Sequence, residues 1–250
     1  MLVTLITATF NSAESIKSCV DSVNRQTYPE IEHIIIDGMS NDNTVEIVKK
    51  CAQRSPFVVS EPDKGIYDAL NKGIRLCSGD IIGVVHSDDR LAADDVLDKI
   101  VSVFEERPQV GLVYGDLRYI SKKTGKLVRY WESKPYDETD MKRGWMPPHP
   151  TIFVRRELLL KVGLYNLSYK VSADYDFIIR LFSVHKANGF YIPTIITDMK
   201  IGGASNRNLR AILLKTSEDW RIMRSYGLGL KCLLFKNFSK LGQFFSVPSK

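Results

Sequence analysis

Cysteine is scarce in this 250-residue sequence, and its four cysteines lie far apart. They are Cys19, Cys51, Cys77 and Cys232, and no two of them form a Cys-x-x-Cys pair. The spacing excludes a zinc site of paired cysteines and a disulfide framework, and it favours a reducing compartment.

Long apolar runs are also missing. None approaches the ~18–20 residues that cross a bilayer. The first ten residues, MLVTLITATF, lack the basic start and the small-residue cleavage site of a secretory leader. We therefore expect a cytoplasmic protein without a transmembrane helix.

Three nucleotide and hydrolase motifs are absent. No GxGxxG follows the first predicted strand, which argues against a dinucleotide-binding dehydrogenase. No GxxxxGK[ST] occurs, which argues against a P-loop phosphotransferase, and there is no GxSxG elbow.

Charge is unevenly distributed. The formal net charge is +6, but residues 205–250 carry +7 and residues 1–204 carry −1. The segment 208–227 reads as a helix, and 228–246 is apolar with interleaved lysines. We expect this basic amphipathic tail to lie on an anionic membrane. A helix that packs on its own domain with a basic outer face is the alternative. No nucleic-acid-binding module is visible.

Strands and helices alternate over the first 116 residues. Strands are predicted at 3–10, 31–38, 57–65, 80–89 and 110–117, with helices at 13–26, 40–52, 66–79 and 92–106. The pattern predicts an α/β domain with a mainly parallel sheet, helices on both faces and a ligand site at the carboxyl ends of the strands.

The pattern changes after Leu117. A β-hairpin is expected at 118–133, a helix capped by Ser172 at 172–185, and a strand pair at 190–203. No linker separates this half, so we expect one catalytic domain over 1–204, with halves 1–116 and 117–204, followed by the tail 205–250.

Acidic residues follow two of the predicted strands. Asp37 and the pair Asp88-Asp89 should converge at one sheet edge, together with Thr7 and Thr9. Adjacent carboxylates repel each other and need a cation or ligand, and hard oxygen ligands select Mg²⁺ or Mn²⁺. The plain alternatives are a helix cap for Asp88-Asp89 and turn chemistry for Asp37.

Four stretches then resemble a known family, the family 2 glycosyltransferases with the GT-A fold. They are residues 3–44, 61–89, 149–166 and 172–181, in the expected order over residues 1 to about 200. The resemblance is closest to bacterial members that build exopolysaccharide, O-antigen and capsule.

The resemblance implies a nucleotide-sugar donor site at the sheet edge. The implied donor contacts are Thr7, Ala8, Thr9, Asp37, Asp63, Lys64, Asn71 and Asp88. UDP is favoured over GDP and dTDP as the nucleotide. The acceptor would be a glycan or a lipid-linked glycan at the inner face of the membrane.

The resemblance also implies the metal ligand and the catalytic base. Asp89 would bind Mn²⁺ or Mg²⁺, and His149 could reach the metal or the diphosphate, although a loop histidine is often structural. The family's Glu-Asp pair is replaced by Ala173-Asp174, so Asp174 would be the base, with Asp176 two residues away. Such a base deprotonates the acceptor hydroxyl and inverts the anomeric carbon.

Two other functions remain open at this stage. A nucleotidyltransferase uses a similar sheet, but the loop TATFNSAES lacks glycine and basic residues. A non-catalytic sugar- or membrane-binding relative is the second. Trp131 and Trp145 could line an acceptor site or belong to the core.

Overall fold

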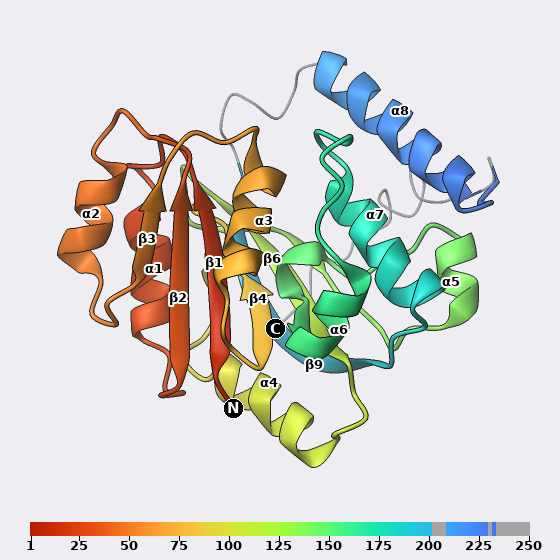
Figure 1. The fold of residues 1–250 in the computed structure, drawn as a ribbon, viewed down its shortest axis with the longest axis horizontal. Coiled ribbons are helices and arrows are strands. Elements are labelled where there is room, and N and C mark those ends of the chain that lie inside the picture. Colours follow the sequence, from red (N-terminus) through yellow and green to blue (C-terminus); the bar gives the residue numbers. More distant parts are fainter. Residues whose placement is uncertain (202–208, 230–231, 234–250) are drawn as a thin grey trace.

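The computed structural model of the chain describes residues 1–201, 209–229 and 232–233. Its centre is a nine-stranded sheet with the order β3-β2-β1-β4-β8-β6-β9-β5, and β7 pairs with β6 outside this path (Figure 1). The first residues build one half of this sheet and the later strands build the other.

The first half consists of parallel strands joined by helices. Strands β1 (Val3–Thr9), β2 (Ile31–Asp37), β3 (Phe57–Ser60) and β4 (Ile81–Val84) alternate with α1 (Ile16–Asn24), α2 (Thr44–Cys51) and α3 (Ile66–Leu76). Strand β1 pairs in parallel with β2 and β4, and β2 with β3. The predicted alternation is confirmed here, and the carboxyl ends of these strands meet at one edge.

The second half is mixed. It contains β5 (Asp89–Leu91), α4 (Val96–Glu106), β6 (Leu112–Ser121), β7 (Leu127–Trp131), α5 (Glu138–Lys142), η1 (His149–Thr151), β8 (Phe153–Arg155), α6 (Arg156–Val162), α7 (Ala173–Ile179), η2 (Arg180–Val184), β9 (Gly189–Ile201) and α8 (Leu209–Ser225). Strand β8 lies antiparallel between β4 and β6, and β5 is antiparallel to β9. The longest pairing of this half, between β6 and β9, is parallel. The expected mainly parallel sheet is therefore confirmed, with short antiparallel pairings added in this half.

Two local predictions fail and one is confirmed. The hairpin at 118–133 forms between β6 and β7. The strand pair expected at 190–203 is one long strand, β9, which pairs with both β6 and β5. Ser172 stands at the start of α7, but its side chain makes no capping hydrogen bond.

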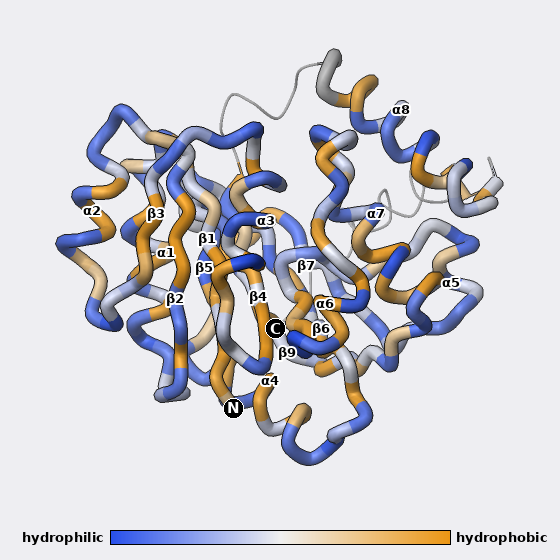
Figure 2. The backbone as a smooth tube through the Cα atoms, in the orientation of Figure 1, coloured by the Kyte–Doolittle hydropathy of each residue, from blue (hydrophilic) through white to orange (hydrophobic). Residues whose placement is uncertain are grey.

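Helices cover both faces of the sheet and enclose two apolar cores. Along β1, Val3 and Leu5 face the core under α1 and α4, while Ile6 and Ala8 face the core under α3, α6 and α7. Figure 2 shows the hydrophobic strands between more polar helix surfaces. This alternation follows from the period of two in a strand.

The C-terminal part is described only in pieces. Helix α8 is described, whereas the expected domain boundary at 204/205 and most of the segment 228–246 lie outside the described residues. Within the described ranges, no helix combines the length and the hydropathy needed to cross a bilayer.

Candidate functional site

A cavity of about 280 Å³ opens where β1 ends and α3 begins. We call it the β1–α3 cavity; its lining residues are Ala8, Thr9, Phe10, Ser12, Asp63, Gly65, Ile66, Ala69 and Ser87. The Phe10 side chain is 61% exposed beside it, which is unusual for a phenylalanine. Ala8, Thr9 and Asp63 are among the donor contacts predicted from the sequence, whereas Phe10 was not predicted.

Asp37 and Asp63 lie next to each other at this edge. Asp37 is fully buried and accepts hydrogen bonds from the Ser40 backbone N–H (3.0 Å) and the Ser60 hydroxyl (2.6 Å). A Cβ added to Gly38 would lie 2.6 Å from Asp63 Oδ2, so the glycine permits the close approach of this carboxylate. Asp63 also accepts from the Gly65 N–H at 2.8 Å, which orders the loop before α3.

Three of the predicted donor contacts are placed elsewhere. The Thr7 hydroxyl is buried against His33 Nε2 at 3.0 Å. The Asn71 amide is buried and exchanges two hydrogen bonds with the Tyr165 backbone, at 2.8 and 2.9 Å. The exposed Lys64 uses its backbone N–H to bond Asp68. Among the described contacts, none brings these three side chains into the β1–α3 cavity.

The predicted acidic pair lies beyond the end of β4: Asp88 is in a turn, and Asp89 closes that turn and opens β5. Strand β4 ends at Val84, and the Asp89 N–H donates to the His86 carbonyl at 2.9 Å to form what we call the His86–Asp89 turn. His86 lines one cavity, and Ser87 lines the β1–α3 cavity. This turn therefore borders both cavities, and Ser87 and Asp88 also line a third, polar cavity.

The two carboxylates of the turn differ in environment. Asp88 is half exposed, faces a polar cavity of about 660 Å³ and lies 3.8 Å from Lys122 Nζ. Asp89 is 1% exposed, and neither of its carboxylate oxygens has a hydrogen-bond partner among the described residues. Burial and the nearby charge of Asp88 raise the pKa of Asp89 well above its usual value, although the Lys200 backbone opposes this weakly without forming a well-made hydrogen bond.

An unpartnered buried carboxylate suits a cation. A divalent ion bound to Asp89 would stabilise the charged form, and oxygen is the ligand that Mg²⁺ and Mn²⁺ prefer. No group of three or more metal-binding side chains occurs among residues 1–201, 209–229 and 232–233. The protein would thus supply few ligands, and the remaining ones would have to come from substrate phosphates or water.

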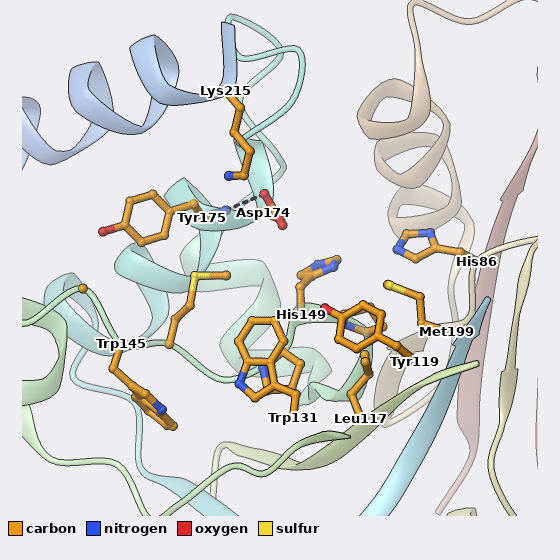
Figure 3. Close-up of a pocket in the computed structure, with 14 residues that line it drawn as sticks. His86, Leu117, Tyr119, Trp131, Trp145, His149, Asp174, Tyr175, Met199 and Lys215 are labelled. Atoms are coloured by element: carbon orange, nitrogen blue, oxygen red, sulfur yellow. Dashed lines mark hydrogen bonds between the residues drawn. The ribbon is translucent and has the colours of Figure 1, made fainter. Parts of the chain in front are cut away.

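A second cavity of about 270 Å³ lies across the turn, and we call it the aromatic cavity. Its lining residues are His86, Leu117, Tyr119, Trp131, Gly144, Trp145, Met146, Pro148, His149, Pro150, Asp174, Tyr175, Met199 and Lys215. In Figure 3, Asp174 and Lys215 lie on one side of it, and Tyr119, Trp131 and His149 lie across from them. The predicted residues Asp174, His149, Trp131 and Trp145 are therefore brought together.

Asp174 stands at the first turn of α7 with its carboxylate at this cavity. Its Oδ1 accepts the backbone N–H of Tyr175 at 2.8 Å and lies 3.2 Å from the Tyr67 hydroxyl. Burial and the Asp174 charge raise the pKa of Tyr67, so the phenol keeps its proton and can donate it in a hydrogen bond. Tyr67 comes from α3, so two distant segments orient this carboxylate.

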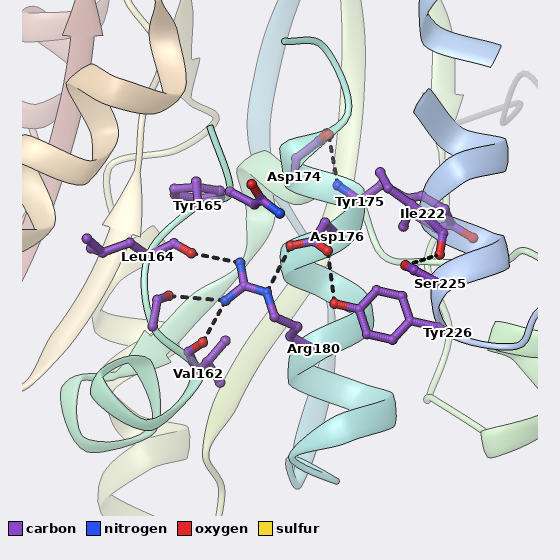
Figure 4. A network of polar contacts seen from close by, with 12 residues as sticks. Val162, Leu164, Tyr165, Asp174, Tyr175, Asp176, Arg180, Ile222, Ser225 and Tyr226 are labelled. Carbon is purple, nitrogen blue, oxygen red and sulfur yellow. Dashed lines mark hydrogen bonds and ion pairs between the residues drawn. The ribbon is translucent and has the colours of Figure 1, made fainter. Parts of the chain in front are cut away.

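Asp176 has a different role, shown in Figure 4. It is buried and accepts hydrogen bonds from Arg180 Nε and from the Tyr226 hydroxyl, both at 2.9 Å. Arg180 in turn donates to the backbone carbonyls of Val162 and Leu164. The Asp176 carboxylate is committed to this network, which leaves Asp174 as the acidic group of α7 at the cavity.

His149 is buried and neutral. Burial lowers its pKa to about 4, and its Nε2 lies 2.7 Å from the Tyr165 hydroxyl. Its ring centroid is 6.1 Å from that of His86, whose buried Nδ1 lacks a partner among the described residues. A neutral imidazole can serve as a hydrogen-bond donor or as a metal ligand.

Comparison with known proteins identifies relatives over most of the chain. Residues 4–163 match the sequence profile of a family described as "Glycosyl transferase family 2". A PGL/p-HBAD biosynthesis glycosyltransferase of Mycobacterium bovis BCG is 32% identical over 234 residues, which are 92% of this chain and 87% of that protein. Chondroitin synthase of Escherichia coli is 29% identical over 185 residues, covering 73% of this chain and 27% of that protein.

Solved structures show the same fold at low sequence identity. The mannosyltransferase PcManGT of Pyrobaculum calidifontis, in complex with GDP-Man and Mn²⁺, has a TM-score of 0.68 at 20% identity, covering 96% of this chain and 70% of that one. TarS 1–349 of S. aureus, in complex with UDP-GlcNAc, has a TM-score of 0.67 at 17% identity. This second match covers 90% of this chain and 65% of the TarS chain, which is less than two thirds.

Proposed function

This chain belongs to glycosyl transferase family 2 and is a glycosyltransferase, and we propose that it moves a sugar from a nucleoside diphosphate sugar to an acceptor hydroxyl with inversion and with help from a divalent metal. The supporting observation is the His86–Asp89 turn between two cavities. A donor on one side and an acceptor on the other would meet at this turn, which carries the buried and unpartnered Asp89 carboxylate.

The β1–α3 cavity suits the nucleotide. The exposed Phe10 ring offers a stacking surface for a base, and Asp63 and the Thr9 hydroxyl, which has no partner among the described residues, offer polar contacts. In this proposal Ala8 and Asp37 shape the edge, and Asp88 lies near the ribose. UDP is favoured over GDP and dTDP, and the solved relatives were crystallised with UDP-GlcNAc and with GDP-Man.

Asp89 would hold Mn²⁺ or Mg²⁺ together with the donor's phosphates. An ion held there would supply positive charge to neutralise the departing nucleoside diphosphate. His86 in the turn and His149 next to it, whose pKa values are both lowered by burial, are further candidate groups for the metal or the diphosphate.

Asp174 would act as the base on the acceptor side. The Tyr67 hydroxyl and the Tyr175 N–H hold its Oδ1, so the Oδ2 atom is free of the contacts described for Oδ1 and can accept the proton of the acceptor hydroxyl. Attack from the aromatic cavity, opposite to the departing diphosphate, inverts the anomeric carbon.

The acceptor would bind in the aromatic cavity. Trp131 and Trp145 offer apolar faces for a sugar ring, and the Trp131 indole N–H is buried without a hydrogen-bond partner among the described residues. We propose a glycan or lipid-linked glycan acceptor at the inner face of the membrane. The exposed Ile212, Leu213 and Trp220 of α8 are the apolar side chains that would reach an anionic lipid surface.

A nucleotide panel tests the donor site. The melting temperature is measured with UDP, GDP, dTDP and CMP, each with and without Mn²⁺. We expect one diphosphate to raise the melting temperature, and only when Mn²⁺ is present. At one hundred times its Kd, a ligand that binds only the folded state stabilises the protein by roughly 2.7 kcal/mol. A shift with no nucleotide at millimolar concentration, or equal shifts without metal, would contradict the proposed site.

Phe10→Ala is expected to weaken nucleotide binding about tenfold or more. The stacking of a base on an aromatic ring contributes roughly 1–3 kcal/mol. Isothermal titration of the diphosphate selected by the panel measures the change. Phe57→Ala is the matched control, because Phe57 is 55% exposed on β3 and does not line the cavity. Equal affinities of the two variants would remove Phe10 from the site.

A further inference from the structure

A carboxylate from α8 holds the segment that leads into α7. Glu218 is 3% exposed, and its side chain accepts three backbone N–H groups. These are the N–H groups of Lys170 (2.8 Å), Val171 (2.9 Å) and Ser172 (3.0 Å). A single side chain thus fixes three consecutive residues that lie 46 to 48 positions earlier in the chain.

Helix α7 does not anchor its own beginning. The Ser172 side chain at its start makes no capping hydrogen bond, and its hydroxyl has no partner among the described residues. A Ser or Asp in that position usually accepts a backbone N–H of the first turn. Here the order of the segment comes from Glu218, and so from a different helix.

The anchored segment leads directly to Asp174. The Tyr67 hydroxyl lies 2.9 Å from the Val171 carbonyl oxygen and 3.2 Å from Asp174 Oδ1, so its one proton serves both acceptors. Glu218 therefore fixes Val171, Val171 helps to place the Tyr67 hydroxyl, and Tyr67 contacts the Asp174 carboxylate.

Helix α8 is tied to the same region at further points. Ile222 and Met223 are buried in the core that contains α7, and the Tyr226 hydroxyl bonds Asp176 (Figure 4). Lys215 pairs with Asp219 at 3.1 Å and lines the aromatic cavity. All these residues lie beyond residue 163, where the match to the family ends.

We propose that Glu218 is a positioning residue for the reaction, which acts by fixing the backbone that carries Asp174. The inference rests on the proposed role of Asp174 as base. It makes α8 a part of the catalytic domain, in line with the alternative of a helix that packs on its own domain rather than with a membrane-bound tail alone. A misplacement of about 1 Å in a reacting group can reduce a rate about a hundredfold.

Glu218→Ala is the first test. We expect kcat to fall about tenfold to a hundredfold, while the Kd of the nucleoside diphosphate changes less than twofold, because neither Glu218 nor the segment it holds lines the β1–α3 cavity. Glu218→Gln keeps one carbonyl acceptor and should recover part of the lost kcat. An unchanged kcat in Glu218→Ala would overturn the proposal.

Glu32→Ala controls for a mere loss of stability. Glu32 also accepts a backbone N–H, from Ser78 at 2.9 Å, but it lies at the start of β2, away from the carboxyl ends of the strands. We expect its melting temperature to fall while kcat is kept. If Glu32→Ala loses as much kcat as Glu218→Ala at equal destabilisation, the effect is structural and the proposal is wrong.

A double variant separates this inference from the function on which it rests. If Glu218 acts through Asp174, then adding Glu218→Ala to Asp174→Asn should cause little further loss of kcat. The same loss in both backgrounds would refute the positioning role alone. A fully active Asp174→Asn variant would instead refute the assignment of the base.

Discussion

Asp174→Asn is expected to reduce sugar transfer about a thousandfold while the affinity for the nucleoside diphosphate stays unchanged. Asparagine keeps the size of the side chain and can still accept from Tyr67 and from the Tyr175 N–H, but it cannot take up a proton. General base catalysis contributes roughly 10²–10⁴ in rate. The measurement is the rate of nucleoside diphosphate release under saturating donor.

Asp95→Asn is the matched control for this substitution. Asp95 also stands at the start of a helix, α4, where it pairs with Lys99 at 2.8 Å, far from either cavity. If Asp174 were only a favourable charge at a helix start, both variants would keep their rates and lose similar small amounts of stability. Full activity of Asp174→Asn would contradict its role as base.

Asp89→Asn should abolish most activity and stabilise the metal-free protein. In the folded state the carboxylate of Asp89 is buried without hydrogen-bond partners, and its pKa is raised well above the usual 3.8. Each unit of such a shift costs about 1.4 kcal/mol at a pH above both pKa values. The uncharged amide of asparagine removes the cost of burying a charged carboxylate. We therefore expect Asp89→Asn to lose function and to gain stability.

The pH dependence of the gain follows from the direction of that shift. Because the folded state binds the Asp89 proton more tightly than the unfolded state, the wild type loses stability as the pH rises above the usual carboxyl pKa. Asparagine does not titrate, so its advantage should be present at neutral pH and vanish below about pH 4. Such a gain appears as a rise in melting temperature of roughly 2–4 °C per kcal/mol.

Thermal unfolding in EDTA, from pH 4 to pH 8, measures this gain. Asp88→Asn is the control, because Asp88 is half exposed and lies near Lys122. A lower melting temperature of Asp89→Asn at neutral pH would mean that the carboxylate is stabilised in the folded protein without metal, and the argument for a cation there would fail.

The sequence alone predicted the parts of the fold that depend on local pattern. The alternation of apolar residues in β1 and the helical spacing in α1 and α3 predict those elements. The acidic residues at the end of β2 and after β4 indicated which edge of the sheet carries the site. The antiparallel insertion of β8 between β4 and β6 was not predictable, because it depends on pairing between residues far apart in the chain.

The sequence predicted which residues belong to the candidate site better than it predicted the contacts that those residues make. The sequence could not separate Asp174 from Asp176, since only the contacts of Arg180 and Tyr226 show that Asp176 is committed elsewhere. The buried amide of Asn71 and the role of Glu218 depend on partners tens of residues away. Phe10 could have been noticed, because an aromatic residue directly after a strand at a ligand edge is a natural stacking surface.

The stereochemistry of the reaction tests the central claim most directly. With the donor that the nucleotide panel selects, proton NMR can identify the anomer of the first sugar formed, on a simple glycoside or on water, before mutarotation. A base at Asp174 on the face opposite to the metal-bound diphosphate predicts a product of inverted configuration. A product that retains the donor's configuration would contradict the assignment of Asp174 and the placement of donor and acceptor on opposite sides of the His86–Asp89 turn.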